Sequence, residues 1–326
     1  MTYQLPAPAG YFPYRSGVFS VSPGLAKLGK SFGNGAADSQ LTQIDSDWYH
    51  YFGEKIRSKE DSISKYIVEG EDYSRSSKMV AKKLLEIILS EHDEYFCLQG
   101  SKASGFNLTN RLTKQSIVFD RNYSIVDVYG SSVAPSSYHS LLEALTMQLQ
   151  EDLIIIRDNR VVALYVYFPN HWAPERMLGK NFFDVHKPVP GMNLTTSSVS
   201  KLLSALTKKE YVRFAWGVSS DTWLNHHPLP ASEIDNSVWA GRRIDWENPK
   251  IYLRVERQVS QPMQDKQGFL FFIRTYFSDI AKLNEFDVEM LLSALKTMSP
   301  KQLLYKGLDQ QVEELINYLE RRLQYC

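Results

Sequence analysis

The sequence predicts an α+β fold in which helices pack on an antiparallel sheet. Two runs of apolar residues flank a polar turn at 157–160, a pattern typical of a β-hairpin. Two further runs, at 251–259 and 269–277, are joined by a segment that contains proline and glycine, and they predict a second hairpin. Helical periodicity before and after the hairpins indicates helices that cover the sheet.

The N-terminal part of the chain changes character near residue 40. Residues 1–40 are rich in proline, glycine and serine, which predicts an extended arm without regular structure. Aromatic and apolar residues then recur at helical spacing over 45–68 and again over 77–90. The predicted organisation is therefore an arm at 1–40 and one domain at 41–326, with helices at both ends of the domain.

The elements after Gly130 follow from the local pattern of apolar residues. No internal repeat or low-complexity tract interrupts them. The expected elements are, in order, a helix at 141–149, strands at 153–156, 161–168, 211–218, 251–259 and 269–277, and helices at 279–296 and 300–324.

Composition and charge exclude several classes of function. Lysine plus arginine equals aspartate plus glutamate, at 37 each, so no overall field draws the chain to nucleic acid or to an anionic membrane. Only Cys97 and Cys326 could form a disulfide, so we expect the protein to be located in a reducing cytoplasm. The N-terminus lacks a basic region before an apolar run, and no stretch is long enough to span a membrane, so we expect neither secretion nor membrane insertion.

Common catalytic and metal-binding motifs do not occur in the sequence. The missing motifs disfavour zinc hydrolysis, a structural zinc, covalently attached haem, a bound nucleotide and a serine nucleophile elbow. His226 and His227 precede Pro228, and because neighbouring side chains of an extended chain point to opposite sides, we interpret them as part of a solvated loop. Cys97 lies among aromatic and apolar neighbours, which favours a buried inert thiol over a metal ligand.

Two arginines of the second predicted hairpin stand out. Arg257 and Arg274 each alternate with apolar residues, so each shares a face of the sheet with apolar side chains. A guanidinium on such a face needs an anion, because burying it unpaired costs several kcal/mol. A carboxylate of a ligand, such as a haem propionate, would serve, and so would an internal salt bridge to Glu256, Glu151 or Asp152.

The segment 168–191 follows a predicted strand and carries four prolines and two glycines after its first residue, so it must form a shaped loop. Within it, His186 follows aromatic and apolar residues and is bounded by Pro188 and Pro190, which restrict the backbone. Such a setting could hold an imidazole rigidly toward an iron. A structural histidine with hydrogen-bond partners is the alternative interpretation.

Several segments together resemble the family of haem-dependent oxidative N-demethylase alpha subunits. The most specific are His-x-Pro-Val-Pro, which begins at His186, and Arg-Val-Glu-Arg-Gln, which begins at Arg254. The matching segments are, in order along the chain, 19–25, 150–153, 168–190, 253–258 and 272–276.

The resemblance implies a PAS-like fold that holds a b-type haem. It implies oxidation, with dioxygen, of a small secondary amine such as dimethylamine, which yields methylamine and formaldehyde. In the family, electrons come from NADPH through separate subunits that carry flavin and a [2Fe–2S] cluster. This chain shows a motif for neither, so the resemblance implies that a reductase supplies them in trans.

The resemblance also directs attention to particular residues. On physical grounds His186 is the best candidate for the axial ligand of the iron, and the resemblance strengthens this assignment. Arg257 and Arg274, and after them Arg254, are the candidates for anchors of the propionates or of the substrate. The stretch at 213–216 departs from the arginine-asparagine-tryptophan pattern of the family, and 176–178 departs from its glutamate-lysine pattern. These departures affect the identity of the expected substrate more than the expectation that the chain binds haem.

Three classes of function remain open from the sequence. The chain could be a haem monooxygenase subunit that acts on an amine, a haem-binding sensor or binding module of the same fold, or a scaffold that has lost the cofactor. A Soret band would exclude the third hypothesis, and turnover of a methylated amine would exclude the second.

Overall fold

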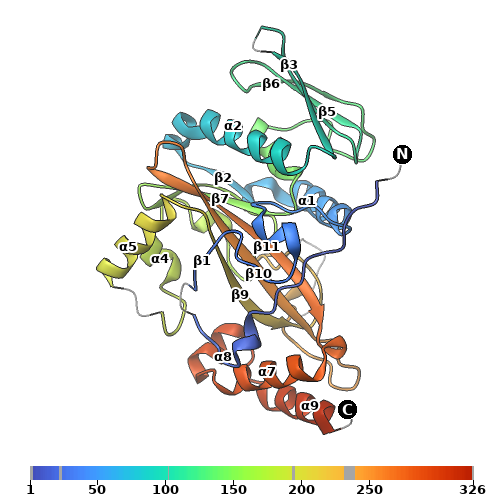
Figure 1. Cartoon of the computed structure of the whole chain (residues 1–326), viewed down its shortest axis with the longest axis vertical. Coiled ribbons are helices and arrows are strands. Elements are labelled where there is room, and N and C mark those ends of the chain that lie inside the picture. Colours follow the sequence, from blue (N-terminus) through green and yellow to red (C-terminus); the bar gives the residue numbers. More distant parts are fainter. Residues whose placement is uncertain (1–2, 22–23, 102, 193–194, 231–238, 325–326) are drawn as a thin grey trace.

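The computed structural model describes residues 3–21, 24–101, 103–192, 195–230 and 239–324. Within them the chain forms two antiparallel sheets and a set of helices around them, which confirms the predicted α+β class (Figure 1). Cys326 and part of the 19–25 segment lie outside the described residues. None of the described helices is long and apolar enough to cross a membrane.

A seven-stranded antiparallel sheet forms the centre of the molecule (Figure 1). Its long strands β10 and β11 form the second predicted hairpin, and β7 and β8 form the first. Across the sheet the strands are β1 (Ala26–Lys27), β9 (Tyr211–Ser219), β10 (Tyr252–Pro262), β11 (Gly268–Asp279), β7 (Asp152–Arg157), β8 (Arg160–Tyr165) and β2 (Ile67–Glu69).

A smaller, four-stranded sheet stands at the top of the view in Figure 1, beyond helix α2. The sequence analysis did not predict this sheet. Each of its strands pairs with the next along the chain, so it is a simple meander. The strands are β3 (Phe96–Ser101), β4 (Gly105–Asn110), β5 (Gln115–Phe119) and β6 (Ile125–Tyr129).

Helices cover the sheets and both ends of the central one (Figure 1). One large apolar core joins the first two helices to the central sheet, and a second joins the C-terminal helices to β9, β10 and the arm. The described helices are α1 (Trp48–Ser62), α2 (Ser74–Glu91), α3 (Leu141–Met147), α4 (Phe182–His186), α5 (Thr196–Leu206), α7 (Glu285–Lys296), α8 (Pro300–Lys306) and α9 (Val312–Gln324).

The first hairpin turns as the sequence predicts, but its second strand is shorter than expected. Asp158 and Asn159 both adopt positive φ, at 49° and 59°, which is the backbone of a tight hairpin turn. Strand β8 ends at Tyr165 instead of residue 168. The buried carboxylate of Asp152 accepts hydrogen bonds from the backbone N–H groups of Tyr167 and Phe168, at 2.8 and 3.1 Å, so these groups leave the ladder of the sheet.

Four predicted helices are shorter than expected. The helix expected at 279–296 begins at Glu285, after a 3-10 turn at 280–282, and the one expected at 141–149 ends at Met147. The pattern at 45–68 is helical only over α1, and its last residues join the sheet as β2, where β-branched Ile67 and Val68 suit an extended edge strand. The segment at 300–324 is divided into α8 and α9 at Gly307, whose φ of 70° ends α8 in the left-handed conformation.

The N-terminal arm is more regular than predicted. Two 3-10 turns, Pro13–Ser16 and Gly35–Ser39, and the short strand β1 interrupt its extended course. Strand β1 pairs with β9 and so extends the central sheet by one strand. The arm is thus part of the sheet, and the division into an arm and a single domain stays a prediction.

The central sheet has two chemically different faces. Val255, Arg257 and Val259 of β10 lie opposite Tyr276, Arg274 and Phe272 of β11, and we call this side, which packs into the large cores, the apolar face. The alternate side chains of β10, Arg254, Glu256 and Gln258, lie on the other side, which we call the polar face. On β9, Gly217, Ala215 and Arg213 pair with them and belong to the polar face too.

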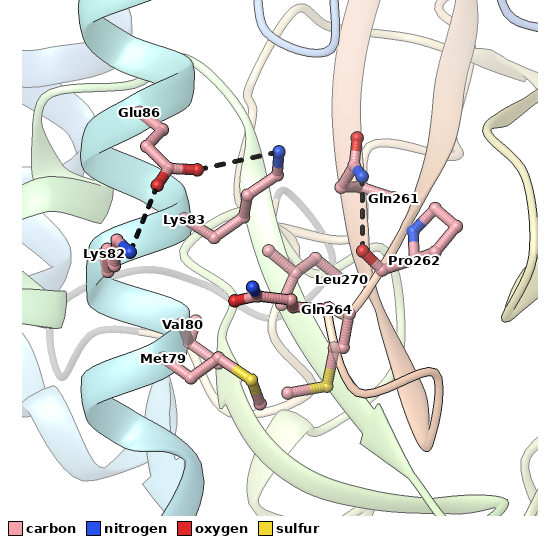
Figure 2. A pocket seen from close by; sticks show the side chains of 10 residues that line it. Met79, Val80, Lys82, Lys83, Glu86, Gln261, Pro262, Gln264 and Leu270 are labelled. Atoms are coloured by element: carbon pink, nitrogen blue, oxygen red, sulfur yellow. Dashed lines mark hydrogen bonds and ion pairs between the residues drawn. The ribbon is translucent and has the colours of Figure 1, made fainter.

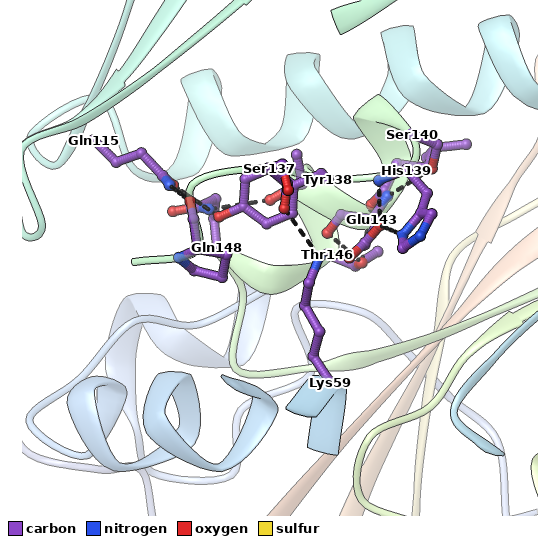
Figure 3. A network of polar contacts seen from close by, with 12 residues as sticks. Lys59, Gln115, Ser137, Tyr138, His139, Ser140, Glu143, Thr146 and Gln148 are labelled. Atoms are coloured by element: carbon purple, nitrogen blue, oxygen red, sulfur yellow. Dashed lines mark hydrogen bonds and ion pairs between the residues drawn. The ribbon is translucent and has the colours of Figure 1, made fainter. Parts of the chain in front are cut away.

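A buried polar network joins the smaller sheet to α1 through α3 (Figure 3). Lys59 of α1 reaches Glu143 of α3, whose second oxygen accepts a hydrogen bond from the backbone of His139 at 2.6 Å. Tyr138 donates to Gln115 of β5 at 2.9 Å. Glu143 is only 1% exposed, so its ion pair with Lys59 and its hydrogen bond from His139 N hold together a buried part of the network.

We predict that Glu143→Ala lowers the free energy of unfolding by about 1–3 kcal/mol, because it leaves Lys59 and the His139 backbone N–H without their buried acceptor. Urea denaturation measures the loss. Glu86→Ala is the matched control, since Glu86 pairs with Lys82 and Lys83 at 3.9 Å on an exposed helix surface and should change stability by less than about 0.5 kcal/mol. Equal losses in both variants would contradict the prediction.

Candidate functional site

The histidine singled out by the sequence ends the short helix α4. Asn181 caps this helix by accepting a hydrogen bond from Asp184 N. The Nδ1 atom of His186 lies 2.8 Å from the carbonyl oxygen of Phe182, and the two rings stack with centroids 4.0 Å apart. Because a carbonyl only accepts, Nδ1 carries the hydrogen and Nε2 keeps its lone pair, which is the tautomer that binds a metal through Nε2.

The surroundings of His186 keep its imidazole neutral. Burial lowers the pKa of His186, and the nearby Arg213 guanidinium lowers it further, against the effect of the hydrogen bond to Phe182. A metal-binding imidazole must be neutral, because a protonated ring has no lone pair to give. The charge state and the tautomer of His186 therefore both suit a ligand of iron.

Helix α4 lies against the polar face of the sheet. Val185 packs on a small apolar cluster that includes Leu164 of β8. The register places Leu164 opposite Ile154, and Ile154 opposite Phe271, so all three point to the polar face. Hydrogen bonds between the loop and β8 fix this position, including Val161 N to Lys180 O at 3.0 Å.

Four cations gather on the polar face, and we call them the cation cluster. Arg213, Arg254 and Arg242 each lie close enough to Lys306 to influence it, and Glu256 is the carboxylate close to Lys306, Arg213 and Arg254. Burial lowers the pKa of Lys306 to about 8, and it lowers the pKa of each of the three arginines as well. Arg242 also lies near Asp309, and Arg254 lies near Asp152 and Asp221, so these carboxylates offset part of the charge. Lys306 and Arg213 have only Glu256 among the carboxylates that influence them, and this part of the face therefore favours a further anion.

The geometry of this cluster supports the same conclusion. Glu256 is already engaged, by Gln258 at 3.0 Å and by Arg254 Nε at 4.0 Å. Arg213 Nε is buried and has no hydrogen-bond partner in the part of the chain that the structure describes. The stem of Lys306 lies over β9, 3.7 Å from where a Cβ of Gly217 would be. An unsatisfied buried donor beside other cations is a place where an anionic ligand would bind.

Arg257 and Arg274 lie on the opposite, apolar face, directly across from each other. Arg274 binds Asp45 at 2.5 Å and the carbonyl of Gln43 at 2.9 Å. Arg257 donates to the carbonyls of Gln40 and Leu41. The internal partner of Arg274 is thus Asp45 rather than any of the three carboxylates considered from the sequence.

The structure does not bring the four predicted site residues together. Arg254 shares the polar face with His186 and donates to the carbonyls of Trp223 and Leu224, both at 3.0 Å. Arg257 and Arg274 are separated from His186 by the sheet and are occupied by the arm. Their role as anchors stays a prediction.

Sequence reasoning missed Arg213, Arg242 and Lys306. The signal for Arg213 was present, since it lies two residues from Ala215 and four from Gly217 on one face of β9. Two small residues beside an arginine leave room for a ligand to approach the strand. Lys306 and Arg242 carried no such signal, because their position depends on how α8 and a loop pack on the sheet.

The interpretation of the two adjacent histidines as part of a solvated loop is wrong. His226 and His227 are 2% and 0% exposed. Their loop folds back on the segment after β8, where the backbones of His171 and His226 hydrogen-bond at 3.0 Å. Each ring then finds a carboxylate: His227 Nε2 lies 3.1 Å from Glu175, and His226 Nε2 lies 3.2 Å from Asp221.

A pocket of about 310 Å³ lies on the apolar face, between α2 and the β10–β11 hairpin (Figure 2). Its lining contains no histidine or cysteine. Met79, Met263 and Leu270 form its apolar part, and Lys82 and Lys83 lie at α2 beside Glu86. It shares no residue with the cation cluster or with α4. The described residues also contain no group of three or more His, Cys, Asp or Glu side chains that could hold a bare metal ion.

Comparison with known protein families identifies the family of the chain. A family model described as "Haem-dependent oxidative N-demethylase, alpha subunit-like" matches residues 34–316 of the chain. No curated protein matches the chain. The match spans every strand of the central sheet except β1, together with α4 and the cation cluster.

We predict that Asp45→Ala lowers the free energy of unfolding by about 3–5 kcal/mol, because it leaves the buried Arg274 charge without its counterion. Thermal or urea denaturation of the purified protein measures this loss. Asp47→Ala is the control, since Asp47 is exposed and forms no ion pair with a described residue. A loss below about 1 kcal/mol for Asp45→Ala would show that other groups hold Arg274.

Proposed function

We propose, since the chain belongs to the family of haem-dependent oxidative N-demethylase alpha-subunit-like proteins, that it binds a b-type haem on the polar face of the central sheet. We propose further that it oxidises a small secondary amine such as dimethylamine with dioxygen, releasing a primary amine and formaldehyde. The observation that carries this proposal is His186, whose Nε2 lone pair is free and which lies near a cluster of excess positive charge.

The residues of the polar face fit a haem. A b-type haem needs a fixed nitrogen donor for its iron, cations for its two propionates, and apolar surroundings for its ring. His186 would be the donor, oriented by Phe182. Arg213, with its unsatisfied Nε, and Lys306 would hold the propionates, and the cluster around Leu164 would contact the ring.

When bound, the haem would supply the redox chemistry with dioxygen, and the chain sets its position and surroundings. The hydrogen bond from Nδ1 to Phe182 keeps the His186 ring from turning and keeps Nε2 unprotonated. Arg213 and Lys306 would bind the propionates through charged hydrogen bonds. The apolar cluster around Leu164, with Trp172, would exclude water from the bound haem.

The remaining features of the function rest on the family. An alpha-subunit-like family implies further subunits. We propose that these include a reductase that carries flavin and a [2Fe–2S] cluster and delivers electrons from NADPH. We also propose the PAS-like fold and the division into an arm at 1–40 and a domain at 41–326. The two cysteines of the chain are compatible with the proposed cytoplasmic location. A haem-binding sensor is the alternative, and turnover of a methylated amine with a reductase excludes it.

We predict that His186→Ala abolishes or shifts the Soret band while the far-ultraviolet circular dichroism spectrum stays that of the folded protein, because the iron loses its protein ligand. Absorption spectroscopy of protein produced with ample haem measures this. His50→Ala is the control, since His50 lies half exposed on α1 and should leave the band unchanged. An unchanged band in His186→Ala removes the ligand assignment, and a colourless wild-type protein removes the haem.

We predict that Arg213→Gln and Lys306→Gln each weaken haem retention by about tenfold, since each removes a charged hydrogen-bond donor to a propionate. Transfer of haem to apomyoglobin measures the dissociation rate. Because the pKa of Lys306 is lowered to about 8, this lysine loses its charge as the pH rises through 8, so haem uptake by the haem-free wild type should weaken there. That step should be missing in Lys306→Gln.

Arg321→Gln, on the exposed surface of α9, is the control for both variants and should retain haem as the wild type does. If Arg213→Gln and Lys306→Gln behave like this control, the propionates lie elsewhere, and Arg257→Gln and Arg274→Gln become the next variants to measure.

A further inference from the structure

A second constellation on the polar side of the sheet has no role in the proposed binding of haem. Buried His226 and half-buried Asp221 form a pair, which we call the dyad, in which His226 Nε2 lies 3.2 Å from Asp221 Oδ1 and 3.3 Å from Oδ2. A carboxylate only accepts, so the hydrogen of the neutral ring is on Nε2. The other ring nitrogen, Nδ1, therefore carries a lone pair and can act only as an acceptor.

This acceptor is unsatisfied. His226 is 2% exposed, and its Nδ1 has no hydrogen-bond partner among the residues that the structure describes. A buried acceptor without a partner costs about 1–3 kcal/mol. Such a cost at a residue that is otherwise well held calls for an external donor.

The ring of His226 is held firmly in place. His171 stacks on it with centroids 5.4 Å apart and an angle of 11° between the rings, and Trp239 meets it edge-on at 6.2 Å. Gly241, at a φ of 56°, approaches so closely that a Cβ there would lie 2.4 Å from His226 Nε2. His171 itself has a φ of 64°, which non-glycine residues adopt rarely. The dyad is thus fixed from three sides, as a binding group would be.

The charges around His226 keep it neutral. Asp221 faces it from its own loop, His171 from the segment after β8, Arg254 from β10, and Arg242 from the loop before β10. Burial lowers the pKa of His226, the two arginines lower it further, and Asp221 opposes them. The Nδ1 lone pair is therefore available at neutral pH and is lost only as the pH falls below the ordinary range of histidine.

The dyad borders the proposed haem site. Arg254 and Arg242 are close to His226 and also belong to the cation cluster with Lys306 and Arg213. The same cluster extends to His186 through Arg213. A small molecule that binds at His226 Nδ1 would thus lie on the haem-bearing face of the sheet.

We propose that His226 Nδ1 accepts a hydrogen bond from the N–H group of the substrate amine and thereby selects amines that retain an N–H bond. This inference rests on the proposed function. An acceptor between two arginines disfavours an ammonium ion, so the amine binds as its free base. On binding, one N–H bond of the ammonium ion breaks and its proton goes to the solvent. The remaining N–H bond of a secondary amine points to Nδ1, and a tertiary free base has none to offer.

Equilibrium binding tests this selection without turnover. Dimethylamine and trimethylamine are titrated into the oxidised, haem-loaded protein without reductant, and each dissociation constant is corrected to the concentration of free base. The wild type should bind dimethylamine more tightly. In His226→Phe, which keeps a planar ring against His171 and Trp239, dimethylamine should bind about tenfold more weakly while trimethylamine changes less than about twofold.

His227→Phe is the matched control, because His227 is equally buried and paired with Glu175, but its Nδ1 lies 3.0 Å from Leu229 N and is satisfied. It should keep the preference for dimethylamine. For the wild type, the apparent affinity for total dimethylamine should rise about tenfold per pH unit below the pKa of the amine, with one proton released per amine bound.

Three results would overturn the inference. If His226→Phe loses affinity equally for both amines, His226 has a structural role. If it loses affinity for neither amine, ordered water satisfies Nδ1. A wild type that binds both amines equally well refutes the selection, even if the variant does not fold. The proposed function is tested separately, by the Soret band and by formaldehyde release from the wild type with a reductase. If these hold without the amine preference, only this inference falls, and if no amine binds, both fall.

Discussion

Two positive charges in the main core determine how the rest of this chain is arranged. Arg257 and Arg274 lie opposite each other on β10 and β11, and neither can reach solvent. Residues 40–45 supply the compensation, through carbonyl oxygens and the carboxylate of Asp45. This requirement places the end of the arm across the apolar face, because leaving the arginines uncompensated would cost more than ordering the segment.

The same region also contains buried side chains of both positive and negative charge. Glu151 accepts a hydrogen bond from Gln43 N at 2.9 Å, and buried Lys55 donates to the carbonyls of Thr146 and Glu151. Burial raises the pKa of Glu151 and lowers that of Lys55, so each group is stabilised in its charged form mainly by the others. The start of α1, the arm and the first hairpin are therefore held by one shared network.

The sequence predicts much of this fold, but only where the apolar residues follow one clear periodicity, that of a helix or that of a strand. Both hairpins were predicted, because apolar residues alternate or run continuously there and turn residues separate them. The four-stranded sheet was missed because its strands carry polar side chains such as Asn107, Thr109 and Ser116, which bond across its outer surface instead of forming an apolar pattern. At the candidate site, the prolines around His186 drew attention to the segment that forms α4 on the polar face. The cation cluster could not be predicted in this way, because Lys306 comes close to Arg213 only when α8 packs on β9.

The strict alternation along β9 and β10 has a consequence for how such a protein can change. Side chains of the polar face and of the apolar face alternate along these strands, so substitutions at every second position change the polar face and leave the packing of the core intact. A single inserted or deleted residue in either strand is different, because it would exchange the two sets at once, moving guanidinium groups inward and valines outward. Homologous sequences should therefore show substitutions in these strands but no insertions or deletions.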